Sequence, residues 1–402
     1  MLLARAGARV ALVERRTDGE AFKRICGHFI LPSARSALER LGLVEAMERA
    51  GGVRGRLRYW TRYGWVDARP AGGGSECESI SLRREVLDPM LRKLAAETPG
   101  VELMLGHTLE GVAAGRAGAS VELRRSGRPA LTLRAKLVVG ADGRGSRTAE
   151  LAGVRTRTRR NDRFCYASYF EGPPLGTGAS AHVWFTEPDI GIVTPTDSGL
   201  MLYAAFVEKS RLPEFKRDPE AALRAFVAGL PDPPPIAESR LVGPMLGKLD
   251  LTNEWRRPAV GRVALIGDAA MAADPVGAVG CGWAFQSADW LADALAPALA
   301  GEEPLARGLR RYRRRHQREL LGHWFSTSDV SRARPLAPPE RLLMSAATRD
   351  RKLALLTEDF AGRRIGLGRM AMPQTLGRAL WVNARDWLRQ RRGPAQPARA
   401  SS

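Results

Sequence analysis

Short apolar runs alternate with amphipathic stretches along most of the chain. Three runs, at residues 8–13 (ARVALV), 136–140 and 263–267, have the composition of buried strands, and helical patterns follow the second and third. Four more apolar runs within residues 164–207 are separated by Gly, Pro and Asp, with a turn-like PTDSG segment at 195–199. From about residue 303 the pattern is helical. It therefore predicts an α/β chain with an antiparallel sheet in its middle and a helical C-terminus.

Composition narrows the class of protein. The 402 residues are 44% hydrophobic and 26% charged, enough for a sizeable core in one to three domains. The four cysteines are scattered without a CxxC pair and the five histidines lack metal-ligand spacing, so neither a disulfide framework nor a metal site is predicted. Scattered cysteines also fit a reducing, cytoplasmic compartment. No apolar run reaches the roughly 18 residues of a membrane span.

The formal net charge of +20 raises the question of an anionic partner. Arginines supply most of the excess and are spread along the chain, apart from clusters at 310–318 and 385–392. These clusters hold only Tyr312 and Trp387 as aromatics and match no zinc finger or RRM, so no nucleic acid partner is predicted. An acidic carrier protein that holds the substrate, or a peripheral membrane contact, is compatible with the charge.

The strand at 8–13 is followed by Glu14. In a dinucleotide-binding βαβ unit, an acid at the end of the second strand binds the adenosine ribose, about 20 residues after a glycine-rich turn. Counting back from Glu14 passes the start of the sequence before such a turn. This interpretation therefore expects the first strand and the glycine loop to be missing. A single buried strand with a solvated Glu14 explains the segment equally well.

Two turns further along the chain share one design, in which a buried strand leads into an aspartate and glycines. Residues 136–147 (KLVVGADGRGSR) contain Asp142 and Gly143, and residues 262–295 contain Gly267 and Asp268 before a glycine-rich loop and a helical pattern. An aspartate at the end of a strand can accept hydrogen bonds from ribose or ribityl hydroxyls, and a helix N-terminus favours anionic atoms. Each turn alone is ordinary, but the ordered pair favours a nucleotide-type cofactor.

These ordered motifs resemble those of the FAD-dependent monooxygenases and reductases of the para-hydroxybenzoate hydroxylase type, which include geranylgeranyl-reductase-like and flavin-halogenase-like relatives. The resemblance spans most of residues 1–320 and rests on ARVALVERR (8–16), KRICGHFILPSARSALERLGL (23–43), SLRREVLDPMLRKLAAE (81–97), LVVGADGRGS (137–146) and RVALIGDAAMAADPVGAVGCGWAFQSADWLADAL (262–295). It implies a Rossmann-like FAD-binding domain interleaved with an antiparallel substrate-binding sheet. It also implies FAD as cofactor and NAD(P)H as transient reductant.

The resemblance implies roles for individual residues as well. The residues it places around FAD are Glu14 at the ribose, Arg15 next to it in the sequence, Arg24 near the phosphates, Arg84 at the start of a helix, Asp142 and Gly143 as the DG motif, Gly267 and Asp268 as the GD motif, and Pro275, Gly277, Gly280 and Gly282 along the isoalloxazine edge. Met271 and Ala149 depart from the family pattern, and the tryptophan pair of the halogenases is missing. Halogenation is therefore not expected, and no catalytic acid or base is singled out.

The substrate pocket is expected where the antiparallel sheet lies over the flavin. Trp184, Ile192, Pro195 and Tyr203 are candidates to line it, and His28, beside a Cys-Gly pair, is a candidate to face the flavin. For each of them a place in the ordinary core is the more frequent alternative.

The expected organisation is a FAD-binding domain at 1–55, 80–160 and 250–325, a substrate-binding sheet at 56–79 and 161–249, a helical segment at 326–390 and a disordered tail at 391–402. The expected function is an FAD-dependent monooxygenase that hydroxylates or epoxidises an apolar or aromatic small molecule with NAD(P)H and O2. The alternatives are an FAD-dependent alkene reductase of the prenyl type and an N-terminally truncated, non-catalytic remnant with impaired FAD binding.

Overall fold

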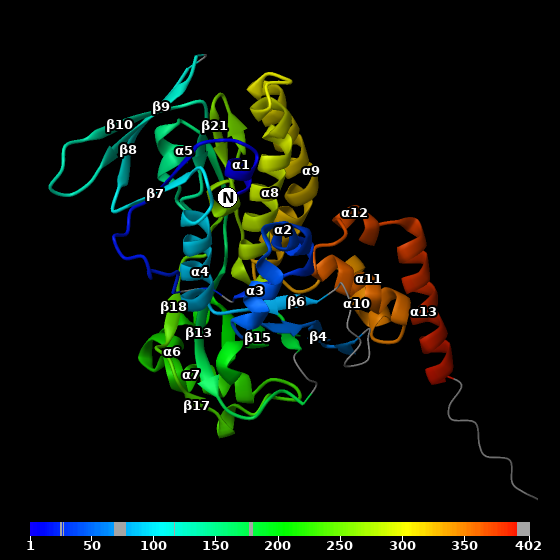
Figure 1. The fold of residues 1–402 in the computed structure, drawn as a ribbon. Coiled ribbons are helices and arrows are strands. Elements are labelled where there is room, and N and C mark those ends of the chain that lie inside the picture. Colours follow the sequence, from blue (N-terminus) through cyan, green and yellow to red (C-terminus); the bar gives the residue numbers. More distant parts are fainter. Residues whose placement is uncertain (25, 27, 68–77, 116, 177–179, 392–402) are drawn as a thin grey trace, which may run out of the picture.

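The computed structural model of the chain describes residues 1–24, 26, 28–67, 78–115, 117–176 and 180–391. These residues form a mixed α/β structure that contains a large sheet, several smaller sheets, a pair of long helices and a helical C-terminal part at one side (Figure 1). Residues 68–77 of the predicted substrate-sheet segment and most of the predicted disordered tail lie outside the described residues.

Two short parallel ladders carry the predicted buried strands. After α1 (Leu2–Arg5), β1 (Val10–Glu14) pairs in parallel with β7 (Val101–Leu105). β11 (Val138–Gly140) pairs in parallel with β21 (Val263–Leu265), and β20 (Ala259–Val260) extends that sheet. Within the described part of the chain, β1 and β11 each lie at the edge of their sheet. Leu12, in the middle of β1, is 37% exposed, although β-branched and leucine residues of a parallel strand are normally covered on both faces.

The eight-stranded sheet follows the predicted apolar runs. Its order is β17-β13-β16-β15-β14-β4-β5, with β18 also paired to β13. The strands are β4 (Leu57–Thr61), β5 (Gly64–Val66), β13 (Arg163–Glu171), β14 (Ala181–Phe185), β15 (Ile190–Pro195), β16 (Met201–Glu208), β17 (Arg240–Leu241) and β18 (Leu246–Lys248). The turn between β15 and β16 lies at the PTDSG segment, as predicted, and the β4–β5 hairpin joins the same sheet.

Both faces of this sheet are covered. One face packs against α6 (Leu212–Arg217) and α7 (Pro219–Ala228) through a core that includes Trp184, Tyr203 and Phe215. The other face contributes Tyr59, Val183 and Phe206 to a core shared with the C-terminal helices α10 (Pro338–Ala347), α11 (Arg351–Ala361), α12 (Leu367–Met370) and α13 (Pro373–Arg391). Because successive residues of a strand point to opposite faces, neighbours in one strand belong to different cores.

The rest of the described chain forms further helices and small sheets. The long helices α8 (Gly280–Leu299) and α9 (Leu305–Val330) pack on each other through Trp283, Trp290, Tyr312 and Trp324. The shorter helices are α2 (Arg35–Leu41), α3 (Leu43–Arg49), α4 (Arg84–Ala96) and α5 (Arg147–Leu151). The small sheets are formed by β2 (Phe29–Ile30), β6 (Ser79–Ser81) and β3 (Val53–Gly55); by β10 (Leu131–Ala135), β9 (Ala119–Arg124) and β8 (Thr108–Ala114); and by β12 (Thr156–Arg159), β19 (Asn253–Arg256) and β22 (Met271–Ala272).

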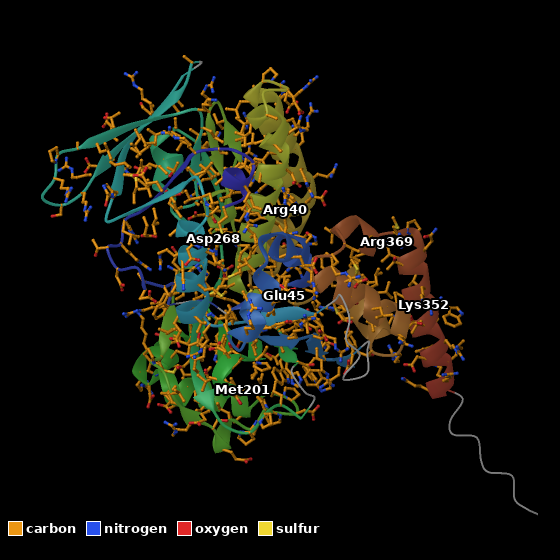
Figure 2. All side chains as sticks on the ribbon, in the orientation of Figure 1. Arg40, Glu45, Met201, Asp268, Lys352 and Arg369 are labelled. Carbon is orange, nitrogen blue, oxygen red and sulfur yellow. The ribbon has the colours of Figure 1, made fainter. Side chains whose placement is uncertain are left out.

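The C-terminal helices form an arm beside the main body, where Figure 2 labels Lys352 and Arg369. The helical prediction for the chain after residue 303 is thus confirmed by α9 to α13. None of the described helices has the length and apolar character needed to cross a bilayer.

Candidate active site

One cavity of about 2610 Å³ runs through the middle of the molecule. It is bounded by both parallel ladders, the first turn of α8, one face of the large sheet and the C-terminal helices. Glu14, Asp142 and Asp268 all line it, although they are far apart in the sequence. The structure therefore brings together the three carboxylates that the sequence motifs single out.

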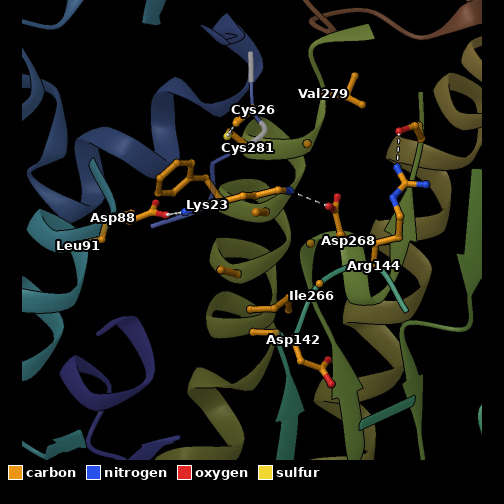
Figure 3. A pocket seen from close by; sticks show the side chains of 18 of the residues that line it. Lys23, Cys26, Asp88, Leu91, Asp142, Arg144, Ile266, Asp268, Val279 and Cys281 are labelled. Carbon is orange, nitrogen blue, oxygen red and sulfur yellow. Dashed lines mark hydrogen bonds and ion pairs between the residues drawn. The ribbon is translucent and has the colours of Figure 1, made fainter. Parts of the chain in front are cut away.

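Asp268 lies in the short turn Gly267–Ala269 that follows β21. Gly267 has φ +56°, and a Cβ there would approach the Cβ of Ala284 to 3.1 Å, so α8 packs closely on this turn. The turn is also tied down by the Gly267 N–H, which donates to Ser287 Oγ at 2.8 Å. The Asp268 carboxylate meets Lys23 Nζ at 3.4 Å, as Figure 3 shows. A Cβ at Gly280 would lie 3.7 Å from Asp268 Oδ1, which places this carboxylate beside the start of α8.

The loop before α8 is held by a buried polar cluster. Asp274 is fully buried and accepts hydrogen bonds from Val276 N–H at 2.9 Å and from Asn161 Nδ2 at 2.9 Å, while its own N–H donates to Asn253 Oδ1. Burial raises the pKa of Asp274, which these hydrogen bonds only partly offset. The cluster fixes the Pro275–Gly277 turn, and Pro275, Gly277 and Gly280 line the cavity as the loop runs into α8. Gly282 lies one step further along and does not line it.

Asp142 also lines the cavity, but its carboxylate has local partners. Its Oδ2 accepts from the Thr148 N–H at 2.8 Å and from Thr148 Oγ1 at 2.9 Å, and its Oδ1 accepts from Ser146 Oγ. Ser146 in turn caps α5 by accepting from Ala149 N–H. The carboxylate therefore organises the start of α5, while Gly143 beside it remains part of the cavity wall.

The basic residues predicted around the cofactor have different positions. Arg15 and Arg84 line the cavity and Arg24 does not. Arg84 Nε is paired with Asp88, and its Nη1 lies 3.8 Å from Cys26 Sγ and 3.6 Å from Cys281 Sγ. Lys23, which sequence reasoning did not single out, lies opposite Asp268.

The residues predicted to line the substrate pocket do not all lie on the face of the large sheet that borders the cavity. Ile192 lines the cavity together with Val183, Phe185, Leu202, Ala204 and Phe206. Trp184 and Tyr203 are fully buried in the core on the opposite face, and Trp184 Nε1 donates to Pro231 O at 2.7 Å. Pro195 follows the cavity-lining Thr194 and does not line the cavity itself. Because side chains alternate between the two faces of a strand, the sequence neighbours of Trp184, Pro195 and Tyr203 line the cavity in their place.

His28 is buried and lies at the cavity wall. Its Nδ1 accepts from the Arg84 N–H at 3.1 Å, its ring stacks on Tyr169, and its Nε2 has no hydrogen-bond partner. A neutral ring with the proton on Nε2 satisfies this geometry, and that N–H is then a free donor beside the cavity.

Arg363 is a cavity residue that no sequence motif indicated. It follows α11 with φ 59°, a backbone conformation that residues other than glycine rarely adopt. Its Nε has no hydrogen-bond partner in the described structure. The other nitrogens approach His323 Nδ1 at 3.4 Å and Thr327 Oγ1 at 3.3 Å, and a Cβ on Gly277 would lie 3.1 Å from Nη2. Burial lowers the pKa of Arg363 to about 10 and, with the charge of Arg363, that of His323 to about 3.

A cavity of this size, between parallel ladders and the face of an antiparallel sheet, suits a nucleotide-type cofactor. Residues 1–319 match the family described as FAD binding domain, and the chain belongs to that family. Kynurenine 3-monooxygenase of Xanthomonas oryzae pv. oryzae is 28% identical over 324 residues, which are 73% of this chain and 68% of the relative. The 6-methylpretetramide 4-monooxygenase of Streptomyces rimosus is 26% identical over 345 residues, 77% of this chain and 72% of the relative.

Solved structures give the same fold. The p-nitrophenol 4-monooxygenase PnpA from Pseudomonas putida DLL-E4 superimposes with a TM-score of 0.73 at 20% identity, covering 91% of this chain and 94% of the other. The resemblance to flavin monooxygenases stated from the sequence is confirmed, and FAD is the cofactor of the family.

The residues present fit FAD on structural grounds. Asp268 faces a first helical turn whose backbone N–H groups have no intrahelical partner, and Gly280 leaves room between the two for a ligand atom. The cavity beyond them has the apolar sheet face as its wall. This combination of hydroxyl acceptor, positive helix end and apolar slot suits the ribityl chain and the flat ring of a flavin.

Proposed function

We propose that this protein is an FAD-dependent monooxygenase that uses NAD(P)H and O2 to hydroxylate or epoxidise an apolar or aromatic small molecule. The observation that carries the proposal is the single cavity in which Asp268 and the start of α8 meet the apolar face of the large sheet. When bound, FAD supplies the redox chemistry of the reaction. The protein's part is to bind, orient and exclude water.

The proposed roles of the residues follow from their surroundings. Asp268 would accept hydrogen bonds from the ribityl hydroxyls of FAD, and the first N–H groups of α8 would favour negative charge at that part of the cavity. Glu14 and Arg15, which also line the cavity, would hold the adenosine end. Val183, Ile192 and Phe206 form the apolar wall against which the substrate lies.

Arg363 supports a more specific substrate class. Its guanidinium faces the cavity next to Gly277, and within the described residues no carboxylate lies within ion-pair distance of it. A cation placed in such surroundings is costly unless a ligand pairs with it. We therefore propose an aromatic substrate that carries a carboxylate or another anionic group.

Product analysis tests the proposed activity. The purified chain is titrated with FAD, and NADPH oxidation is followed with aromatic acids and their methyl esters, in air and under argon. The proposal expects flavin absorbance, substrate-stimulated NADPH oxidation and oxygenated product only in air, with acids preferred over esters. Consumption of NADPH with a reduced alkene product under argon would instead establish the alkene reductase.

A second function is favoured by the two sheet edges. The cavity extends along Val10, Leu12, Val138 and Val139, so its adenosine end is open between β1 and β11 in the described part of the chain. The alternative that we propose is that this open end weakens FAD binding and leaves the protein non-catalytic. Flavin that does not co-elute with the protein even at high FAD concentration would establish this second function.

For partners, we propose a peripheral membrane contact through α13. Leu380, Trp381, Trp387 and Leu388 recur at helical spacing on one face and are 57%, 54%, 51% and 48% exposed. Arg385 lies over the Trp381 ring and Arg391 over the Trp387 ring. Apolar and aromatic residues flanked by arginines suit the headgroup region of an anionic bilayer.

Vesicle sedimentation tests this contact. Binding is expected to vesicles that contain phosphatidylserine and not to neutral ones, to weaken with salt, and to be lost in Leu380→Ser/Trp387→Ser. Leu131→Ser, on the remote β10, removes a comparable exposed apolar residue and should change nothing. Salt-independent pelleting, or self-association that only the double variant abolishes, would contradict the membrane contact; retention on an acidic carrier protein would favour the carrier.

A further inference from the structure

Two cysteines meet at the wall of the cavity although 255 residues separate them in the sequence. Cys26 Sγ and Cys281 Sγ are 3.7 Å apart, and both residues line the cavity (Figure 3). Cys26 belongs to the segment before β2, and Cys281 to the first turn of α8. A disulfide requires sulfurs about 2.05 Å apart. For a disulfide to form, the two sulfurs would therefore have to move closer by less than about 2 Å.

Positive charge surrounds the pair. Arg84 Nη1 lies 3.8 Å from Cys26 Sγ and 3.6 Å from Cys281 Sγ, so one guanidinium contacts both sulfurs. The first turn of α8 adds the positive end of a helix at Cys281, and the His28 N–H donates to Cys26 Sγ. Guanidinium groups and helix N-termini are the surroundings that convert thiols to reactive thiolates.

The electrostatics single out Cys26 as the nucleophile. The hydrogen bond from Cys281 outweighs burial and, with the charge of Arg84, lowers the pKa of the Cys26 thiol below its ordinary range. The same hydrogen bond and burial raise the pKa of Cys281, so the proton stays there. A thiolate next to a protonated partner is the arrangement of an attacking and a resolving cysteine.

Cys165 provides an internal contrast. It is buried on β13 at the same cavity, but no guanidinium contact or second sulfur accompanies it in the described structure, and burial raises the pKa of its thiol. Its environment predicts an inert thiol.

We infer that Cys26 and Cys281 form a redox-active dithiol–disulfide pair, held by Arg84, that couples the cavity wall to the thiol–disulfide balance of the surroundings. The oxidant is a low-molecular-weight disulfide such as glutathione disulfide. Cys26 thiolate attacks one of its sulfurs and releases one small thiolate, which takes a proton. Cys281 then attacks Cys26 Sγ, giving up its proton as the second small thiol leaves. The protein loses two electrons and the proton of Cys281, the small disulfide gains both electrons, and the proton taken up by the first small thiolate comes from solvent.

The consequence is structural. A bond between Cys26 and Cys281 ties the segment before β2 to the start of α8, the helix end that faces Asp268. The oxidised and reduced forms therefore present different walls to whatever occupies the cavity. The inference does not depend on the proposed monooxygenase activity.

Thiol trapping on the full chain tests the pair. The protein is equilibrated in glutathione buffers of increasing oxidised fraction, quenched in acid, alkylated and mapped by mass spectrometry. The expected result is a Cys26–Cys281 cross-linked peptide, two hydrogens lighter than its separate parts, that forms and disappears reversibly. In reduced native protein, Cys26 should react with iodoacetamide at pH 7 at least about tenfold faster than Cys165.

Variants separate the pair from chance oxidation. Cys281→Ser should leave Cys26 as a mixed disulfide with one glutathione, and Cys26→Ser should leave Cys281 unreacted. Cys165→Ser is the matched control and should leave the cross-link unchanged. Arg84→Gln should slow alkylation of Cys26, with circular dichroism confirming the fold, whereas Arg84→Lys should restore part of the rate. Absence of the cross-link at every glutathione ratio, or alkylation of Cys26 no faster than Cys165, would overturn the inference.

Discussion

Asp142 and Asp268 follow neighbouring parallel strands, β11 and β21, and each is preceded or followed by glycine, yet their carboxylates have different partners. Asp142 accepts three hydrogen bonds from Ser146 and Thr148 within its own turn. Asp268 has one long contact to the exposed Lys23 and otherwise faces the cavity. The Asp142 carboxylate therefore stabilises its own turn, whereas the Asp268 carboxylate is available to bind a ligand.

The difference teaches that the residues after an aspartate decide its role. Serine and threonine four and six positions after Asp142 offer hydroxyl and amide donors that a short loop brings back to the carboxylate. The five residues after Asp268, AAMAA at 269–273, offer no side-chain donor. The same combination of strand, aspartate and glycine therefore produces a helix-organising turn at Asp142 and an open binding turn at Asp268.

The largest expected effect is on stability, from Asp142→Ala. The variant removes three hydrogen bonds to a carboxylate, two of them to the buried Thr148, so the free energy of unfolding should fall by about 2–4 kcal/mol. Urea unfolding followed by circular dichroism measures this. Asp142→Asn, which keeps an acceptor oxygen, should lose about half as much. A variant as stable as the parent that binds FAD more weakly would show that Asp142 is the ligand-binding carboxylate.

Asp268→Ala should produce the opposite pattern. Its single contact to the half-exposed Lys23 contributes less than about 1 kcal/mol to stability, so unfolding should barely change. The dissociation constant for FAD, from flavin fluorescence titration, should rise about tenfold, which corresponds to about 1.4 kcal/mol. Asp293→Ala on the same helix α8 but away from the cavity is the control and should leave FAD affinity unchanged. Equal affinities in the two variants would contradict the proposed role.

Sequence alone could predict the elements but not which faces they present. The strands from Arg163 to Glu208 and the turn at 195–199 are confirmed because apolar runs and turn residues are local signals. Both faces of this sheet are packed, so Trp184 and Tyr203 are as apolar in pattern as Val183 and Phe206. Nothing local distinguishes the cavity face from the core face.

The cavity residues that the motifs missed come from tertiary contacts over long separations. Arg363 reaches Gly277 from beyond the region that matches the family, and the Cys26–Cys281 pair joins two distant segments. No spacing rule links such residues. The unusual left-handed backbone at Arg363 is visible only in the structure.

Arg363→Met tests a side chain that we expect to contribute to ligand binding and not to the stability of the fold. Removing a cation that lacks a carboxylate partner in the described structure should leave the free energy of unfolding unchanged or raise it by about 1 kcal/mol. Binding of an aromatic acid should weaken about fivefold, while its methyl ester is unaffected. Because the pKa of Arg363 is lowered to about 10, acid binding to the parent should weaken as the pH rises through 10. A variant that binds the acid and ester as the parent does would contradict the proposed substrate class.

The smallest effect is expected on stability at low pH, and it concerns a third aspartate, Asp197, whose carboxylate accepts hydrogen bonds within the fold. Asp197 in the β15–β16 turn accepts from Arg83 N–H and Nε, each at 2.8 Å, and from Thr196 Oγ1. Burial raises the pKa of Asp197, but these hydrogen bonds outweigh it, so the pKa lies below its ordinary value. The carboxylate therefore contributes stability that is complete above about pH 4, the pKa in the unfolded chain, and is lost as the pH falls through the lower folded pKa. The melting temperature of the parent should fall more steeply below pH 4 than that of Asp197→Asn, which is less stable at neutral pH but carries no titrating group there. Parallel curves for the two proteins would show that the hydrogen bonds from Arg83 do not favour the ionised carboxylate, and that commitment to local donors is no guide to how an aspartate in this fold behaves.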